Sequence, residues 1–428
     1  METIFAQASA LGKAGVAVIR ISGPQAFAAG RALAGTLPAP KTTGLRTLRD
    51  GAGSIIDAAL VLPFAAGASF TGEETVELHV HGSVAVCRAV LDRLGQIEGL
   101  RPAAPGEFTR RALANGRMDL TQVEGLADLI DAETEAQRRQ AMRIHTGELS
   151  RLIAEWRDDL ESAIALVEAT IDFADEEVPD DLMPHVQQIV DRVETSIATH
   201  LGGAAAARSI ASGFEVAIVG APNVGKSTLL NRLAGREAAL TSEIAGTTRD
   251  VVEVRMDMGG LAVTLLDTAG LRETEDTIET LGIARAVERA NGADLRVFLR
   301  GNDAETVSVE RQDDDIQVVG KADLRSGVGG GVSGLTGAGV DELVSEITEV
   351  LRGRVAGASL ATRDRHAEAL RQGADALSTF RNDCARDAPP EILAEDLREA
   401  ARALDVLLGR IDVEDILGRI FSRFCIGK

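Results

Sequence analysis

One short segment constrains this chain more than any other. Residues 220–227 read Gly-Ala-Pro-Asn-Val-Gly-Lys-Ser, which is the pattern of a phosphate-binding loop. The apolar run at 214–219 predicts a buried strand before the loop, and the apolar spacing at 227–233 predicts a helix after it. The backbone N–H groups of such a loop surround a phosphate at the helix N-terminus. A glycine-rich turn before a helix is the alternative, and the agreement of strand, glycines, Lys-Ser and helix disfavours it.

Charge and cysteine content exclude several classes of protein. The chain has 428 residues and a formal net charge of −21, which argues against bulk electrostatic wrapping of nucleic acid. Its three cysteines, Cys87, Cys384 and Cys425, are widely separated and fit neither a disulfide framework nor a zinc site. The sequence shows no signal-peptide pattern and no apolar run long enough for a bilayer, so we expect a cytoplasmic protein without membrane attachment.

The order of periodic patterns predicts a multidomain protein. Strand-like and helix-like segments mix near the N-terminus, and a stripe of apolar residues at 149–167 predicts one long amphipathic helix. Strand and helix patterns then alternate as in a parallel doubly wound sheet, before helical periodicity returns. We expect an N-terminal α+β domain at 1–118, an all-α helical domain in two segments at 119–212 and 356–428, and an inserted α/β Ras-like P-loop domain at 213–355.

A threonine-rich segment follows the predicted helix at the position of a nucleotide switch. It reads Gly-Thr-Thr-Arg-Asp at 246–250, and we expect Thr248 to ligate magnesium together with Ser227. An ordinary threonine-rich turn is the alternative. The next strand pattern leads into Asp267, Thr268, Ala269 and Gly270, where Asp267 would hold a magnesium-bound water and the Gly270 N–H would contact a γ-phosphate.

The segment 317–323, Gln-Val-Val-Gly-Lys-Ala-Asp, favours GTP over ATP. Asp323 can accept hydrogen bonds from two donors on the guanine edge, which adenine does not offer. Gly320 stands where Asn or Thr is usual, so we expect weaker nucleotide affinity with retained guanine preference. Backbone N–H groups at 333–335 would make the last base contact, and the glycine-rich stretch 327–334 is expected to be a flexible loop.

The residue that usually orients the attacking water is missing. Apolar Leu271 takes the position of the Gln found in Ras-like enzymes, so another group must position the water. Glu273, Glu275 and Glu279 are candidates, and a solvated acidic helix start is the alternative for at least two of them. The amide oxygen of Asn223 could ligate a monovalent cation beside the phosphates.

Taken together, these motifs resemble the tRNA modification GTPase family called MnmE or TrmE. The resemblance covers essentially the whole chain, and the terminal Phe-Cys-Ile-Gly-Lys is its most specific part, because terminal peptides normally vary. The other motifs that carry it lie at 20–24, 70–79, 105–109 and 117–122.

For the nucleotide domain, the resemblance implies a potassium-dependent GTPase with Glu279 as the catalytic, water-orienting residue. It assigns magnesium to Ser227 and Thr248, and potassium to Asn223, Ser242, Ile244 and Thr247. The implied GTP-binding residues are Asn223, Val224, Gly225, Lys226, Ser227, Thr228, Ser242, Glu243, Ile244, Ala245, Gly246, Thr247, Thr248, Asp267, Thr268, Ala269, Gly270, Lys321, Asp323, Ser333, Gly334 and Leu335.

For the N-terminal domain, the resemblance implies dimerisation and the binding of 5-formyl- or methylene-tetrahydrofolate. The implied residues are Arg20, Glu77, Arg117 and Lys428, because a pterin edge offers donors to a carboxylate and a glutamate tail attracts cations. Arg20 and Glu77 could instead be ordinary strand-end charges, and Arg117 stands where lysine is common. Cys425 is either a reactive thiol or a small buried hydrophobe.

The implied function is modification of C5 of the tRNA wobble uridine, by carboxymethylaminomethyl addition. A flavoprotein partner, MnmG (GidA), would carry FAD and NADH in a hetero-oligomer with a homodimer of this chain. Because the chain is acidic, we expect tRNA to be bound mainly through the complex. One alternative is a regulatory GTPase switch in ribosome assembly or signalling, and another is a structural helical dimer with a degenerate nucleotide domain. A switch would not need the N-terminal motifs or the Cys-Ile-Gly-Lys end.

Overall fold

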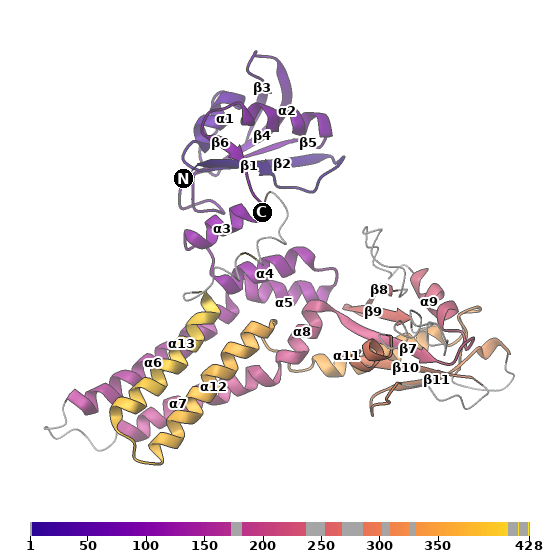
Figure 1. The fold of residues 1–428 in the computed structure, drawn as a ribbon. Helices are drawn as coiled ribbons and strands as arrows, with labels where there is room; N and C mark the ends of the chain where they lie inside the picture. Colours follow the sequence, from indigo (N-terminus) through magenta and orange to yellow (C-terminus); the bar gives the residue numbers. More distant parts are fainter. Residues whose placement is uncertain are drawn as a thin grey trace, which may run out of the picture. The chain divides into compact units, whose positions relative to one another are not determined.

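The structure is a computed structural model with two compact units (Figure 1). One unit comprises Met1–Ala127 and Asp405–Lys428, and the other comprises Asp128–Leu404. The residues that the structure describes are 2–172, 182–236, 253–267, 286–301, 309–324, 331–409, 418 and 427. An α+β part, a helical part and an α/β P-loop part confirm the predicted fold class. The predicted domain boundaries stay predictions.

The N-terminal domain is a six-stranded sheet in the order β3-β4-β5-β2-β1-β6. Helices α1 (Ala26–Ala34) and α2 (Val84–Gly95) share one apolar core with a face of this sheet. On the other side of β1, Phe108 of α3 (Glu107–Ala114) packs with Ile4 and Ala6. The strands are β1 (Thr3–Gln7), β2 (Val16–Ser22), β3 (Gly44–Arg49), β4 (Ile55–Phe64), β5 (Thr75–His81) and β6 (Leu100–Pro102).

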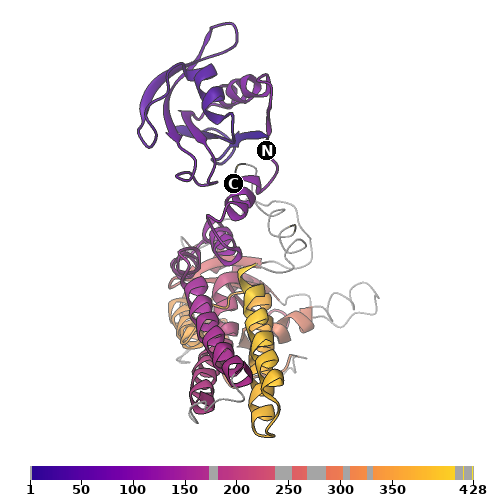
Figure 2. The ribbon, with the colours of Figure 1, turned by 90° about the vertical axis from the view of Figure 1, so that its left-hand side faces the viewer.

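In the part of the chain that the structure describes, the helical part contains four long helices, which lie side by side in both ribbon views (Figures 1 and 2). The predicted stripe at 149–167 is confirmed, because Ile153, Leu160 and Val167 of α6 are fully buried and Trp156 is nearly so. The long helices are α6 (Glu148–Asp172), α7 (Leu182–Gly202), α12 (Asp364–Cys384) and α13 (Pro390–Leu408). The shorter ones are α4 (Leu120–Asp131), α5 (Glu135–His145) and α8 (Ala204–Ser212).

A second six-stranded sheet, in the order β12-β11-β10-β7-β9-β8, forms the P-loop domain. All its pairings are parallel except that of β8 with β9, which departs from the predicted parallel sheet. The two-residue turn Gly259-Gly260, with φ of 62° and 91°, joins these strands as a tight hairpin and therefore makes them antiparallel. The strands are β7 (Phe214–Gly220), β8 (Glu253–Met258), β9 (Leu261–Asp267), β10 (Leu295–Arg300), β11 (Ile316–Gly320) and β12 (Gly331–Val332).

Two further features of this domain bear on its site. Helix α9 (Lys226–Ala234) follows β7, as the sequence predicts, while η1 (Ala322–Leu324) and α11 (Val340–Val355) follow later in the chain. The expectation of a flexible loop at 327–334 is wrong for Gly331 and Val332, which pair with Val319 and Gly320 of β11. Parallel backbone pairing fixes these two residues despite their glycine-rich setting.

The β8–β9 hairpin contacts the first helical segment within the larger unit. The Ala136 N–H at the start of α5 donates to the Gly260 carbonyl at 3.1 Å. Arg255 of β8 forms an ion pair with Glu133 at 2.9 Å. On the other side of the turn, Arg352 Nη2 of α11 donates to the Gly259 carbonyl at 3.1 Å. The hairpin is therefore held by groups from both α5 and α11.

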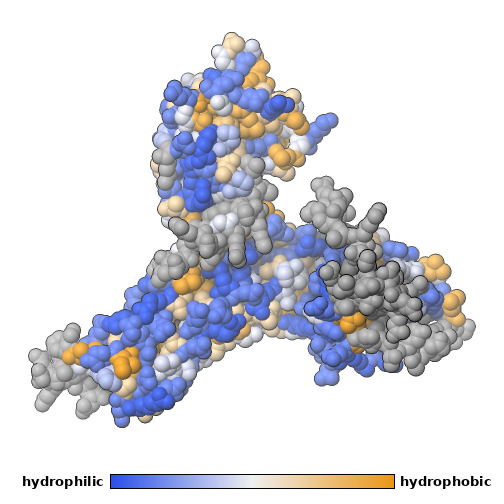
Figure 3. Space-filling view, in the orientation of Figure 1, coloured by the Kyte–Doolittle hydropathy of each residue, from blue (hydrophilic) through white to orange (hydrophobic). Residues whose placement is uncertain are grey.

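Hydrophilic residues cover most of the visible face of the long helices (Figure 3). Among the described residues, no helix combines the length and the apolar character needed to cross a membrane.

Candidate functional site

The loop between β7 and α9 has the backbone geometry of a phosphate cradle. Asn223 and Gly225 both adopt positive φ, at 61° and 110°, and Gly225 caps the N-terminus of α9. Such turns point successive N–H groups into one concavity, and the helix N-terminus adds positive potential there. The loop can therefore bind an anionic phosphate, as its sequence predicts.

Three polar side chains of this loop and of β9 are held close to the cradle. Buried Lys226 donates from Nζ to the carbonyls of Gly220 and Ala221, at 2.7 and 2.9 Å. Ser227 Oγ donates to Oδ2 of Asp267 at 3.0 Å. A hydroxyl and a carboxylate at this separation are the oxygen groups that magnesium prefers, so these residues fit the predicted magnesium site.

A cavity of about 290 Å³ lies beside the phosphate loop and extends to the predicted base loop. Asp323 lines it, and its Oδ1 accepts a 2.5 Å hydrogen bond from the nearly fully buried Ser333 Oγ. This hydrogen bond holds the carboxylate in one orientation. The other lining residues are Val224, Gly225, Thr228, Leu229, Leu299, Lys321, Leu324, Val332, Gly334 and Leu335.

The structure thus brings together the described part of the predicted nucleotide site. Residues from the loop after β7, from α9 and β10, from the segment after β11, and from β12 and the segment after it meet at the carboxyl ends of parallel strands, where open α/β sheets bind ligands. The other predicted nucleotide, metal and catalytic residues lie outside the described residues: Ser242, Glu243, Ile244, Ala245, Gly246, Thr247, Thr248, Thr268, Ala269, Gly270 and Glu279.

Sequence reasoning missed some residues that shape this cavity. Leu299, Leu324 and Val332 line it, and Leu324 is 74% exposed. Apolar residues such as these carry no chemical signature in the sequence, so only their position beside Asp323 reveals this role.

For the predicted potassium site, only one of the four residues is described. Asn223 is exposed and carries a suitable amide oxygen, whereas its three predicted companions fall outside the described ranges. Within those ranges, no cluster of three or more His, Cys, Asp or Glu residues could hold a metal ion.

A second site lies on the N-terminal sheet. Arg20 of β2 and Glu77 of β5 stand directly opposite each other, and Nε and Nη2 of Arg20 both lie 2.9 Å from Glu77 Oε1. The guanidinium also lies over the rings of Phe70 and Phe108, with its central carbon 5.1 and 5.6 Å from their centroids. The two predicted residues therefore form a pair of opposite charges bordered by two aromatic rings, which can favour planar, polar ligands.

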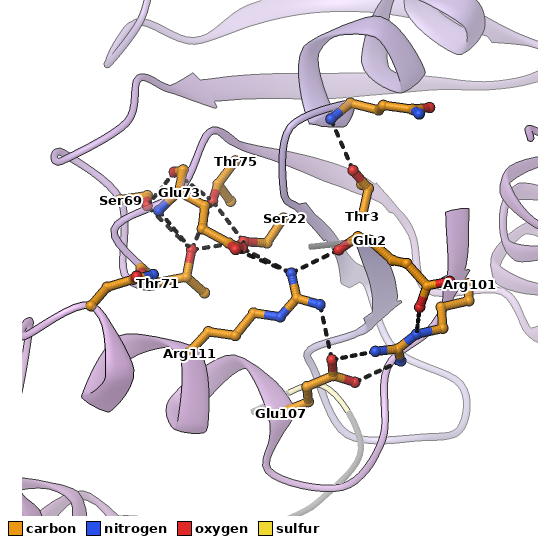
Figure 4. A network of polar contacts seen from close by, with 12 residues as sticks. Glu2, Thr3, Ser22, Ser69, Thr71, Glu73, Thr75, Arg101, Glu107 and Arg111 are labelled. Atoms are coloured by element: carbon orange, nitrogen blue, oxygen red, sulfur yellow. Dashed lines mark hydrogen bonds and ion pairs between the residues drawn. The ribbon is translucent and has the colours of Figure 1, made fainter. Parts of the chain in front are cut away.

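A network of buried charges attaches α3 to this sheet (Figure 4). Glu107 accepts hydrogen bonds from both Nη atoms of Arg101, at 2.8 and 2.7 Å, and from Arg111 Nη2 at 2.9 Å. Arg111 Nη1 also donates to Glu73 Oε2 at 3.0 Å. Burial raises the pKa of Glu107, but the hydrogen bonds from Arg101, the Ala104 N–H and Arg111 outweigh it and lower the pKa to about 2.

The network continues into the loop that carries Phe70. Ser22 Oγ donates to Glu73 Oε2 at 2.7 Å and lies 2.7 Å from the hydroxyl of Thr71 (Figure 4). Asn115 Nδ2 donates to the Thr71 carbonyl, also at 2.7 Å. These bonds fix the loop directly after Phe70, which holds the ring near Arg20.

The remaining predicted N-terminal residues lie near the same loop or at the chain end. Arg117 is exposed beside Gly72, where an added Cβ would lie 3.2 Å from Arg117 Cγ. Gly427 is buried, and an added Cβ there would lie 2.1 Å from the Gln7 carbonyl oxygen. The backbone of the terminal motif therefore packs against the end of β1 at Gly427, while Cys425 and Lys428 lie outside the described residues.

Fold and site together define a multidomain P-loop GTPase. Two family profiles match the chain, one described as "GTP-binding protein TrmE N-terminus" over residues 3–117 and the other as "MnmE helical domain" over residues 120–425. The tRNA modification GTPase MnmE of Cereibacter sphaeroides is 57% identical over 429 residues, and that of Paracoccus denitrificans is 50% identical over 430 residues. Each match covers 100% of both chains.

A solved structure of a single-residue variant of Aquifex aeolicus Era, bound to GDP.AlF4-, is 29% identical. It covers 32% of this chain and 56% of that chain, with a TM-score of 0.25. The family profiles and full-length relatives show that the chain belongs to the tRNA modification GTPase MnmE family, which makes it a GTP hydrolase that takes part in tRNA modification.

Removal of the Ser333 hydroxyl tests the base side of the nucleotide site. In Ser333→Ala, Asp323 loses the hydrogen bond that orients it, so we expect GTP to bind about fivefold more weakly, equivalent to about 1 kcal/mol. Equilibrium titration with a fluorescent GTP analogue measures this loss. Thr336→Ala, three residues further on, is the matched control and should bind as the native chain does. Equal affinities of the two variants would contradict the assigned role of Ser333.

Neutralising Glu107 tests the charge network. Because Glu107 is buried against the largely buried Arg111 and also pairs with the part-exposed Arg101, we expect Glu107→Gln to destabilise the N-terminal domain by about 3 kcal/mol near neutral pH. The lowered pKa means that this stabilisation is fully present above the ordinary pKa of 4.5 and is lost as the pH falls towards about 2. Hydrogen exchange of β1 and β6 amides at several pH values measures the difference. The exposed Glu98→Gln is the control, and a pH-independent gap between native chain and Glu107→Gln would refute this explanation.

Proposed function

We propose that this chain is a potassium-dependent GTPase that modifies C5 of the tRNA wobble uridine by carboxymethylaminomethyl addition. It would act in the cytoplasm with a flavoprotein partner of the MnmG (GidA) type, which carries FAD and NADH. A tetrahydrofolate derivative, 5-formyl or methylene, would supply the one-carbon unit. The observation that carries this proposal is the presence, in one chain of this family, of a P-loop site with an oriented Asp323 and a separate Arg20–Glu77 site.

The Arg20–Glu77 pair supports a folate-type ligand. The Glu77 carboxylate can accept hydrogen bonds from the amino and ring N–H groups of a pterin, while the partly exposed ring of Phe70 suits a flat heterocycle. In this proposal Arg117 and Lys428 attract the negatively charged glutamate tail. The bound folate would supply the one-carbon unit at the oxidation level of its substituent, and the chain's residues would hold and orient it.

Exposed apolar residues on the outer strands β3 and β4 of the N-terminal sheet support a homodimer. Leu45, Leu60, His79 and Val18 form one row across four strands, on the face opposite to α1 and α2. Leu45 is 65% exposed and Leu60 is 47% exposed, so a second copy could bury them. Arg20 and Glu77 lie in the next row of the same face, which would place the folate site at the edge of the dimer contact.

Within the GTPase domain, this chain's residues bind and orient the nucleotide. The backbone of residues 220–227 surrounds the β-phosphate, Lys226 neutralises the phosphate oxygens, and Asp323 selects guanine. Magnesium at Ser227 and Thr248, and potassium at Asn223, Ser242, Ile244 and Thr247, would supply positive charge where negative charge develops during hydrolysis. Glu279 would orient the attacking water, since Leu271 cannot.

The β8–β9 hairpin offers a route by which the state of the nucleotide could reach the helical domain. Strand β9 ends at Asp267, which contacts Ser227, while the turn of the hairpin contacts Ala136 and Arg255 within β8 contacts Glu133 of the helical segment. We therefore assign GTP hydrolysis to driving conformational change rather than to the carbon chemistry.

Salt dependence of GTP hydrolysis tests the potassium site. We expect the native chain to hydrolyse GTP faster in potassium chloride than in sodium chloride. The proposed oxygen ligands would lie at the longer distance that suits K+, which is larger than Na+. Asn223→Ala should lose most of this difference, whereas Asn231→Ala, an exposed asparagine on α9, should keep it. Equal native rates in both salts would remove the potassium mechanism and leave the GTPase assignment intact.

Mass spectrometry of tRNA nucleosides tests the modification. Cells that carry only Glu77→Gln should accumulate wobble uridine without the C5 group, while the purified variant still hydrolyses GTP. Cells with the exposed Glu98→Gln should show normal modification. Full modification in cells that lack the chain altogether would favour the regulatory GTPase switch instead.

A further inference from the structure

The two oxygens of the Glu77 carboxylate face different partners. Nε and Nη2 of Arg20 both lie 2.9 Å from Oε1. Nε2 of His79, two residues further along β5, lies 3.5 Å from Oε2. Alternate residues of a strand point to the same face of a sheet, so Glu77 and His79 share one face, and Arg20 reaches Glu77 from the adjacent strand β2. The carboxylate therefore has a guanidinium at one oxygen and an imidazole at the other.

The packing of His79 holds its ring beside Glu77. In the sheet register His79 is paired with Val18 of β2 and with Leu60 of β4. The side chain of His79 is 32% exposed, while its Nε2 atom is shielded from water. A separation of 3.5 Å is just longer than a good hydrogen bond, so a small rotation of either side chain closes it. When Nε2 carries a proton, Oε2 of Glu77 is the acceptor that lies next to it.

The other charged groups around His79 come from four elements of the same domain. Strand β2 contributes Arg20, and β4 contributes Asp57, whose Oδ1 lies 2.7 Å from Nδ1 of His81 on β5. Burial raises the pKa of Asp57, but the hydrogen bonds from His81 outweigh it and lower the pKa below its ordinary value. The loop before β5 and helix α3 contribute Glu73 and Arg111, which pair with each other at 3.0 Å. Between about pH 5 and 8, carboxylates and guanidinium groups keep their charge, whereas imidazole groups change theirs.

We propose that His79 is a positioning residue of the Arg20–Glu77 site, and that its proton controls whether Oε2 of Glu77 is available to a ligand. The inference rests on the proposed folate function and deepens it. A neutral His79 leaves Oε2 as an acceptor for the amino and ring N–H donors of a pterin. A protonated His79 carries N–H on both ring nitrogens and donates from Nε2 to Oε2. This bond occupies the acceptor and adds positive charge beside the donors of the ligand, so pterin binding is strongest when His79 is neutral.

The experiment measures equilibrium binding of a tetrahydropterin to the full native chain at about pH 5.5 and about pH 8. The probe carries a 5-formyl group, which removes the basicity of N5, and it lacks the glutamate tail with its carboxylates. Its own charge is therefore the same at both pH values. The chain is used at a concentration at which light scattering gives the same mass at both pH values. We expect binding to be about tenfold weaker at the lower pH, because the charge-assisted bond to His79 competes with the probe.

Two variants separate His79 from the other histidine of the strand. His79→Gln places an uncharged amide beside Glu77, so it should bind the probe within about threefold of the native chain at the higher pH and should lose the pH dependence. His81→Gln is the matched control and should keep the pH dependence, because His81 pairs with Asp57 and not with Glu77. A pH dependence that persists in His79→Gln would contradict the proposal. Should His79→Gln fail to fold, the pH profiles of the native chain and of His81→Gln still test it.

The outcomes distinguish this inference from the proposed function. A native affinity that changes by less than about twofold between the two pH values would overturn the role of His79 and leave the folate site intact. If the native chain bound the probe at neither pH, the folate function would fail together with this inference.

Discussion

The nucleotide site depends on backbone atoms that approach one another without side chains between them. A Cβ added to Gly220 would lie 2.5 Å from the carbonyl oxygen of Leu299. A Cβ added to Gly334 would lie 2.6 Å from the backbone nitrogen of Leu229. Gly320 makes the same kind of contact with Val224. Only glycine permits these approaches, so strands β7, β10 and β11 and the segment after β12 can converge on the phosphate loop. The cavity for the base and the orientation of Asp323 follow from this convergence.

The site of the N-terminal domain is built from charged side chains rather than from close backbone contacts. Glu107 and Arg111 are largely buried, and each is paired with more than one partner, which offsets the cost of removing them from water. The resulting network joins α3 to the loop that carries Phe70 and so sets the surroundings of Arg20. Three arginines of this domain, Arg20, Arg101 and Arg111, are in this way paired with carboxylates.

The β8–β9 hairpin connects the nucleotide site with the helical segment of the same unit. Its antiparallel pairing was not anticipated, since a simple alternation of strands and helices predicts only parallel strands. The consequence is that its turn reaches away from the nucleotide and contacts α5, while its other end carries Asp267. Gly259 and Gly260, both with positive φ, make this tight turn possible. The Gly-Gly pair in the sequence was the signal that could have predicted the hairpin.

The sequence by itself determined the phosphate loop, its flanking strand and helix, the stripe of α6 and the family, because each depends on local spacing of residue types. Tertiary structure alone decided the rest. Only in the folded chain does Arg20 lie opposite Glu77, does Ser333 hydrogen-bond to Asp323, and does Gly320 pack against Val224 of the phosphate loop. Cross-strand register and backbone approach arise from how distant segments pack, and no local pattern encodes them.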